Sequence, residues 1–105
     1  MKPRFDHPEL IRYLNRTPIE DFLFDIPTKN GKIVIRGTEL VDRFCKMEHY
    51  EASKVVEQWY WAEWYRMPIE SFLHIYAESV ALNGSIMPGI LNFDIELEKY
   101  KNETH

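Results

Sequence analysis

The sequence is poor in the residues on which most metal, redox and phosphate sites depend. It contains a single cysteine, Cys45, and four dispersed glycines, Gly31, Gly37, Gly84 and Gly89. One cysteine cannot close an internal disulfide, and a cysteine-based zinc site needs further ligands of the same kind. Glycines this far apart do not form the glycine-rich loop that cradles phosphate groups. We therefore predict no metal site and no cofactor.

Long hydrophobic runs are also missing. No apolar stretch approaches the roughly 18 residues that indicate a membrane-spanning helix. The chain does not open with a positively charged and then apolar signal segment. These absences predict a soluble protein of the cytoplasm.

The chain has no overall excess of basic charge. It carries 13 Lys and Arg against 17 Asp and Glu, a formal net charge of −4. Only residues 1–36 are net basic, with seven basic against five acidic side chains; residues 67–105 have two against six. Because phosphate contacts supply most of the affinity for nucleic acids, only the first third suits such a partner. The acidic last third favours a basic partner or serves solubility.

Aromatic side chains, in contrast, are abundant, at 14% of the residues. They contribute much of the buried area of protein cores and interfaces. A chain of 105 residues corresponds to one domain. We expect a loose N-terminal segment over residues 1–8, a globular domain over residues 9–101 and a frayed tail over residues 102–105.

The aromatic residues concentrate in one stretch, Glu57–Leu73, which holds all three tryptophans and ends in a repeat. The octapeptide RTPIEDFL at residues 16–23 returns as RMPIESFL at residues 66–73, with six of eight positions identical. A true duplication predicts two similar helix–loop units. The alternative is a favourable helix start used twice, since proline suits the first helical turn.

The first copy of the repeat lies where two signals compete. Thr17, Pro18 and Glu20 form a capping box that favours a helix over residues 18–25. Asn30-Gly31 is a turn signal, and the β-branched run after it suggests a small hairpin near residues 24–36. We favour the helix and keep the hairpin as the alternative.

Helical spacing of apolar residues recurs along the rest of the chain. It predicts helices over residues 9–14, 38–47, 51–65 and 69–83, with a break at His49-Tyr50 and a left-handed cap at Gly84. Pro68 marks either a new helix or a bend. Residues 84–89 should form a loop, and residues 90–100 fit both patterns, with helix favoured. The expected fold is mainly α, a small bundle of about five short helices.

The candidate partner-binding residues are Trp61, Trp64 and Tyr65. Tryptophan and tyrosine anchor protein interfaces because they offer a large area with few rotatable bonds. Most rings of the surrounding cluster, which includes Trp59 and Tyr60, are expected in the core. Exposure of Trp61 and Tyr65 as an interface pair stays open.

An alternative site would bind DNA. Residues 38–59 have about the right length for a helix-turn-helix, although the second helix is not basic and the turn lacks glycine. The basic residues available to it are Lys29, Lys32, Arg36 and Lys54. Lys29 and Lys32 would flank the hairpin turn as phosphate contacts.

Catalytic groups are scarce. Cys45 and His49 could touch across one helical turn, but no oxyanion stabiliser or orienting group accompanies them. We predict no catalytic residue and no enzyme. The favoured function is a non-catalytic interaction or regulatory protein that binds a partner protein through its aromatic or acidic surface, and a homodimer is compatible with it. The short chain would also suit the small accessory proteins of mobile genetic elements, without a motif to support that class.

Overall fold

The computed structural model describes residues 18–103, apart from the side chains of residues 49, 87–91, 102 and 103. The expected helix over residues 9–14, the capping residue Thr17 and the two last residues of the tail lie outside this range. The elements are η1 (Ile19–Asp21), β1 (Leu23–Thr28), β2 (Gly31–Arg36), α2 (Gly37–Cys45), α3 (His49–Trp64), α4 (Ile69–Asn83) and α5 (Met87–Glu103). The predicted fold class is confirmed, because the described chain is mainly α with one small antiparallel hairpin.

The predicted helix over residues 18–25 is wrong. A single 3₁₀ turn ends at Asp21, and the next residues form β1, which pairs with β2 from Leu23↔Arg36 to Thr28↔Gly31. Phe24 and Ile26 are buried while the residues between them are exposed. This alternation requires a strand, since a helix would turn Phe24 and Ile26 to opposite sides. Strand pairing across the turn and burial of one strand face therefore outweigh the local capping signal.

The tip of the hairpin differs slightly from the expected one. Lys29 and Asn30 occupy the turn, and Gly31, with φ 115°, already belongs to β2. The backbone N–H of Asn30 donates to Thr28 Oγ1 at 3.2 Å, and the Thr28 hydroxyl donates to the carbonyl of Gly31. Pro27 fits inside β1 because the outer edge of a two-stranded sheet needs no N–H donor.

The helix α2 follows β2 without a loop and packs on η1 and β2. Gly37 is buried at this junction, and its N–H donates to the carbonyl of Phe22 at 2.8 Å. A Cβ atom at Gly37 would lie 1.5 Å from the carbonyl oxygen of Ile19. Glycine at this position thus allows α2 to start directly against the 3₁₀ turn.

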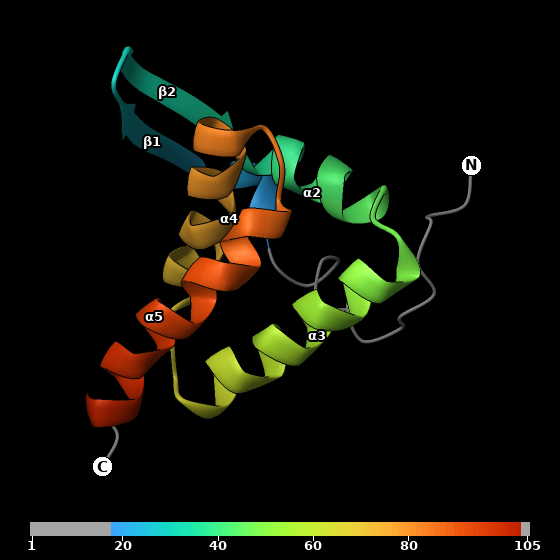
Figure 1. Cartoon of the computed structure of the whole chain (residues 1–105), viewed down its shortest axis with the longest axis vertical. Coiled ribbons are helices and arrows are strands. Elements are labelled where there is room, and N and C mark those ends of the chain that lie inside the picture. Colours follow the sequence, from blue (N-terminus) through green and yellow to red (C-terminus); the bar gives the residue numbers. More distant parts are fainter. Residues whose placement is uncertain (1–17, 104–105) are drawn as a thin grey trace.

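The three longest helices build the larger part of the molecule. The helices α4 and α5 are joined by a short loop and pack against each other, while α3 runs diagonally beside α5 and contacts it (Figure 1). The hairpin projects at the opposite end of the molecule and contacts α4. Among the most deeply buried side chains are Ile19, Ile26, Leu40, Phe44, Val55, Phe72, Leu73, Tyr76 and Phe93. One core thus joins the hairpin to all four α-helices.

The helix boundaries confirm most of the periodicity and correct two details. The break before α3 lies at residues 46–48, because His49 and Tyr50 are already helical. Residues 65–68 separate two helices and do not form a bend within one. Arg66 has a left-handed φ of 60°, which interrupts the helical path before α4 begins at Ile69. Gly84 caps α4 with φ 72°, as predicted.

The end of the chain is helical, as favoured from the sequence. The helix α5 begins at Met87, so the loop after α4 is shorter than the predicted residues 84–89. Pro88 and Gly89 fall in its first turn, where proline is tolerated because its missing N–H would have no helical partner. The strand alternative for residues 90–100 is therefore wrong.

Candidate functional site

The last turns of α3 carry an exposed aromatic patch, which we define as Tyr60, Trp61 and Trp64. Their side chains are 49%, 47% and 74% exposed. Trp59, by contrast, is buried together with Val55, Val56 and Ala62 on the side of α3 that faces the core. The expectation that most rings of this cluster lie in the core is wrong, because α3 meets the core along one side only.

Tyr65 differs from the two tryptophans beside it. It is partly buried, packs against the core and stacks on Trp61, with ring centroids 6.0 Å apart and an interplanar angle of 21°. The ammonium group of Lys101 lies 5.5 Å from the Tyr65 ring centroid, a favourable cation–π arrangement. Tyr65 thus links α3 to the end of α5, and its ring packs against one face of the Trp61 ring.

A groove of about 350 Å³ runs between α3 and α5 next to this patch. Its floor includes Phe93 and Leu97 of α5, and its α3 wall includes Trp61 and Tyr65. Lys54 and Glu57 of α3 and Asp94 and Lys101 of α5 provide charges of both signs along the same groove. The aromatic patch therefore continues into a partly apolar, open hollow.

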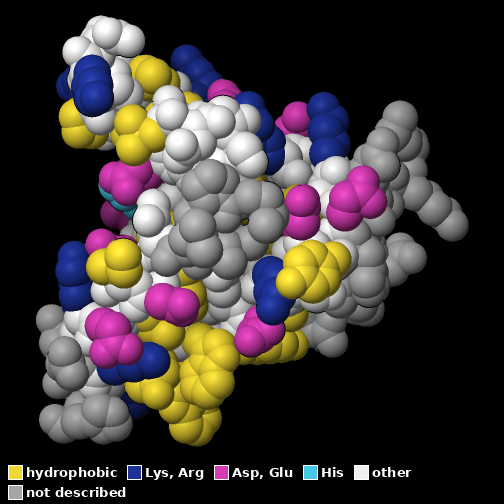
Figure 2. Space-filling model, in the orientation of Figure 1, with side chains coloured by type: hydrophobic (Ala, Val, Ile, Leu, Met, Phe, Trp, Pro, Cys, Tyr) yellow, Lys and Arg dark blue, Asp and Glu magenta, His cyan; other side chains and the backbone are white. Residues whose placement is uncertain are grey.

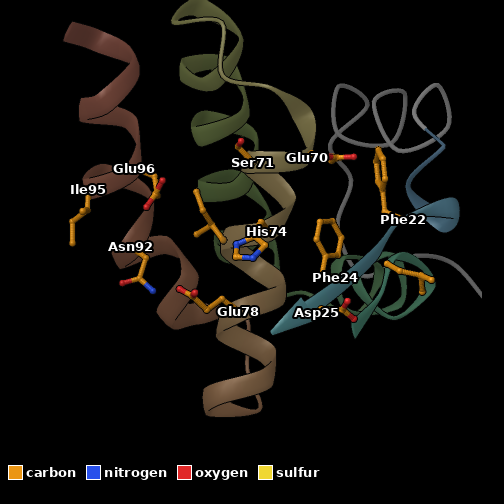
Figure 3. A pocket seen from close by; sticks show the side chains of 12 residues that line it. Phe22, Phe24, Asp25, Glu70, Ser71, His74, Glu78, Asn92, Ile95 and Glu96 are labelled. Atoms are coloured by element: carbon orange, nitrogen blue, oxygen red, sulfur yellow. The ribbon is translucent and has the colours of Figure 1, made fainter. Parts of the chain in front are cut away.

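A second hollow, of about 620 Å³, lies between β1, α4 and α5. We call it the acidic groove, because the described residues that line it include the carboxylates Asp25, Glu70, Glu78 and Glu96 and no lysine or arginine. Figure 3 shows His74 near its centre, with Phe24 on one side and Glu78 and Asn92 on the other. The Phe24 and His74 rings meet edge to face at 6.0 Å.

The acidic groove has apolar rims as well as negative charge. Leu23 of β1 and Ile95 of α5 are 62% and 67% exposed at its border. Within residues 18–103, no group of three or more His, Cys, Asp or Glu side chains is placed to hold a metal ion. Carboxylates with apolar neighbours instead suit a positively charged segment of another protein.

The residues of the DNA-binding alternative are not brought together. Lys29, Lys32 and Arg36 lie on the hairpin, whereas Lys54 lies on α3, across the molecule in Figure 1. Lys32 is engaged with Asp25 at 3.9 Å, and the Lys54 ammonium lies 5.4 Å from the ring centroid of Tyr50. The helix α2 makes its principal contacts with η1 and β2, unlike the first helix of a helix-turn-helix, which packs on the second.

Cys45 has the wrong electrostatics for a nucleophile. Burial raises the pKa of its thiol above the ordinary value, and the negative charge of Asp42 raises that pKa further. The thiol is therefore protonated at neutral pH, whereas a nucleophilic cysteine needs a lowered pKa. The side chain of His49, its proposed partner, lies outside the described part of the structure.

Two features of the surface were missed from the sequence. Tyr50, at the start of α3, is 67% exposed, whereas the sequence pattern indicates only a break between helices at this position. The acidic groove unites Asp25 with Glu70, Glu78 and Glu96, which come from elements distant in the chain. Tyr50 could have been found from its spacing to Lys54, Glu57 and Trp61, but no local signal joins Asp25 to the other carboxylates.

Comparison of the chain with protein families, with curated proteins and with solved structures gives no match. No helix in the described part of the chain combines the length and the hydrophobicity needed to cross a bilayer. The aromatic patch and the two hollows are therefore the candidate sites of this protein.

Proposed function

We propose that this protein is a non-catalytic interaction or regulatory protein that binds a partner protein through the aromatic patch at the end of α3. One observation supports it above all: Trp61 and Trp64 are 47% and 74% exposed while the other side of the same helix is closely packed. Figure 2 shows hydrophobic side chains gathered over this end of α3. Contiguous exposed apolar surface on a folded domain marks interaction sites.

The physical basis of the proposal is the area that the two indole rings can bury. Tryptophan is enriched at the energetic centres of interfaces because it buries a large area and loses little conformational entropy. Tyr65 stacks on Trp61 and is itself in contact with Lys101, so the Trp61 ring is already held in place before binding. A surface that is ordered in advance binds with a smaller entropic cost.

The acidic groove is the second surface to which the proposal extends. Four carboxylates with exposed Leu23 and Ile95 at the border fit a basic segment with an apolar residue. A cytoplasmic location belongs to the same proposal, supported by the single cysteine, which needs no oxidising compartment.

The test uses the full chain as bait in a lysate of its source, with and without nuclease. Trp61→Ala combined with Trp64→Ala should abolish capture of the partner. The thermal midpoint of this double variant should fall by only a few degrees, because both tryptophan side chains are largely exposed. Tyr65 is left unchanged, since its contacts with the core would confuse binding with stability.

The matched control is Leu82→Ala, a large apolar residue that is 54% exposed near the end of α4. It should capture the partner like the unchanged chain. Capture that survives in the double tryptophan variant but is lost in Glu70→Lys with Glu78→Lys would transfer the function to the acidic groove. Capture lost only on nuclease treatment would support the DNA-binding alternative instead.

A further inference from the structure

One side of α3 carries a row of side chains that are exposed, apart from Lys54, which is half-buried. Tyr50, Lys54, Glu57, Trp61 and Trp64 follow one another at spacings of four, three, four and three. On an α-helix this spacing places all five side chains in a single stripe. Tyr50 and Trp64, at its two ends, are 67% and 74% exposed, and Glu57 in the middle is exposed as well.

The stripe has the spacing of a helix-packing surface, and in the described chain three of its members line the open groove that separates α3 from α5. Alternating spacings of three and four are those of the contact seam between two packed helices. In Figure 2 an apolar, a basic, an acidic and again an apolar surface follow one another from the start of α3 to its end.

The two charges inside the stripe distinguish between its possible alignments with a second α3. A parallel alignment places Lys54 opposite Lys54 and Glu57 opposite Glu57. An antiparallel alignment centred on Glu57 again places two carboxylates face to face. An antiparallel alignment centred between residues 55 and 56 places Lys54 opposite Glu57 of the second copy, and Glu57 opposite its Lys54. Like charges in contact disfavour association, whereas opposite charges set the register.

The aromatic ends agree with the same alignment. When Lys54 lies opposite Glu57, Tyr50 lies opposite Trp61 of the second copy, and the symmetry repeats this pair at the other end. Lys54 already lies 5.4 Å from the Tyr50 ring, so its charge would come close to two rings in the assembled pair. The groove between α3 and α5 provides room beside the stripe. A surface that complements itself about a twofold axis is the requirement for a symmetric dimer.

We infer that the partner bound by the aromatic patch is a second copy of this chain. The two α3 helices lie antiparallel, with two Lys54–Glu57 ion pairs at the centre and two Tyr50–Trp61 contacts outside them. This inference rests on the proposed function and names the partner of the same surface. Trp64 of each copy then lies opposite residue 47 of the other copy, just before its α3.

Sedimentation velocity of the full chain at low and high salt tests the inference. The unchanged protein should sediment with twice its chain mass of 12.7 kDa, and less of it should be dimeric at high salt. Lys54→Glu and Glu57→Lys each replace two opposite-charge contacts by two like-charge contacts. Each change should weaken the dimer by about tenfold or more.

The two changes together provide the specific readout. The double variant Lys54→Glu with Glu57→Lys exchanges the charges and should restore the dimer. An equal mixture of the two single variants should also form a mixed dimer, since one carries two glutamates and the other two lysines at the contact. Glu63→Lys is the matched control, because residue 63 is exposed on the far side of α3, and it should remain dimeric.

A monomer at every concentration and salt level would overturn the inference, and so would a dimer that both single variants leave unchanged. Neither result would remove the proposed function, since capture of a different protein by Trp61 and Trp64 would still be measured. A variant that no longer captures the partner protein but keeps its sedimentation mass would likewise separate the proposed function from the inferred dimer. Far-ultraviolet circular dichroism of each variant confirms that it is folded.

Discussion

At the scale of single residues, Gly37 shows how one missing side chain permits a junction. A Cβ atom there would meet the Ile19 carbonyl oxygen at 1.5 Å, far inside contact distance. The backbone N–H of Gly37 also donates to the Phe22 carbonyl at 2.8 Å, so the helix start cannot simply move away. The close approach of η1 and α2 is thus specified by the absence of a methyl group.

Gly37→Ala should therefore lower the free energy of unfolding by about 1–3 kcal/mol or more, because the added methyl group forces the backbone of η1 or α2 to shift. Urea unfolding followed by circular dichroism measures the change. Thr38→Ala, at the next and exposed position, is the control and should stay within about 0.5 kcal/mol. Equal stability of both variants would contradict the close contact between the glycine and the 3₁₀ turn.

The residues of the aromatic patch illustrate the opposite case. Trp59 and Trp61 are two positions apart, yet Trp59 is 6% exposed and Trp61 is 47% exposed. Two positions along a helix correspond to about 200° of rotation, so the two rings point to different sides. The residue type therefore does not determine whether a tryptophan of α3 is buried. Its angular position around the helix axis does.

At the scale of the elements, the two copies of the octapeptide repeat adopt different secondary structures. Its first copy forms a 3₁₀ turn followed by β1, and its second copy opens the helix α4. Leu23 is 62% exposed while its counterpart Leu73 is fully buried. The two similar helix–loop units that a duplication predicts are therefore not found. A shared helix start continues as a helix only where the following residues bury a helical face.

The pairing of α3 with α4 includes a buried polar contact. The hydroxyl of Tyr76 donates to Gln58 Oε1, and both residues are buried. The Tyr76 ring is held edge to face by Phe44 at 5.5 Å and by Phe72 at 5.2 Å. A hydrogen bond in such surroundings contributes to stability and also fixes how α3 lies against α4.

Tyr76→Phe should reduce the free energy of unfolding by about 1–3 kcal/mol, since the ring packing is kept while Gln58 loses its hydroxyl donor. Chemical denaturation measures the effect. Tyr60→Phe removes a hydroxyl from a ring that is 49% exposed, and it should change stability by less than about 0.5 kcal/mol. A Tyr76→Phe protein as stable as the unchanged chain would show that the contact between Tyr76 and Gln58 contributes nothing.

At the scale of the whole molecule, two surfaces of different character remain available around one core. The aromatic stripe of α3 carries both signs of charge in its middle, whereas the described residues that line the acidic groove carry negative charge only, although Asp25 and Glu96 pair with Lys32 and Lys99 nearby. A surface with both charges can complement itself, while a surface of one sign needs a partner of the opposite sign. The two surfaces thus suit a second copy and a basic segment, respectively.

Self-association has a consequence for thermal stability that a monomer cannot show. Because dimerisation favours the folded state by mass action, the midpoint of unfolding should rise with protein concentration. A tenfold increase adds about 1.4 kcal/mol per dimer, or about 0.7 kcal/mol per chain, which corresponds to roughly 3 °C for a domain of this size. Differential scanning calorimetry over a range of concentrations measures this slope. Lys54→Glu should move this rise of the midpoint to protein concentrations about tenfold higher or more, and an unshifted rise in that variant would contradict the assigned register.

Much of the fold and part of the site could be predicted from local patterns. The spans of α2, α3 and α4, the glycine cap at Gly84 and the helical end of the chain follow from apolar spacing and from caps. These signals act over a few residues, so they do not depend on the rest of the molecule. Trp61 and Trp64 could be named as candidates on the same basis, because their residue type alone favours interfaces.

The sequence by itself therefore determined a mainly helical fold, the approximate spans of α2, α3 and α4, and its aromatic centre. The tertiary structure alone decided that residues 23–28 form a strand, that Trp59 is buried while Trp64 is exposed, and that Asp25 joins Glu70, Glu78 and Glu96 in one groove. The physical reason is that burial and strand pairing depend on residues far away in the chain. Such contacts can outweigh a local preference that amounts to about 1 kcal/mol.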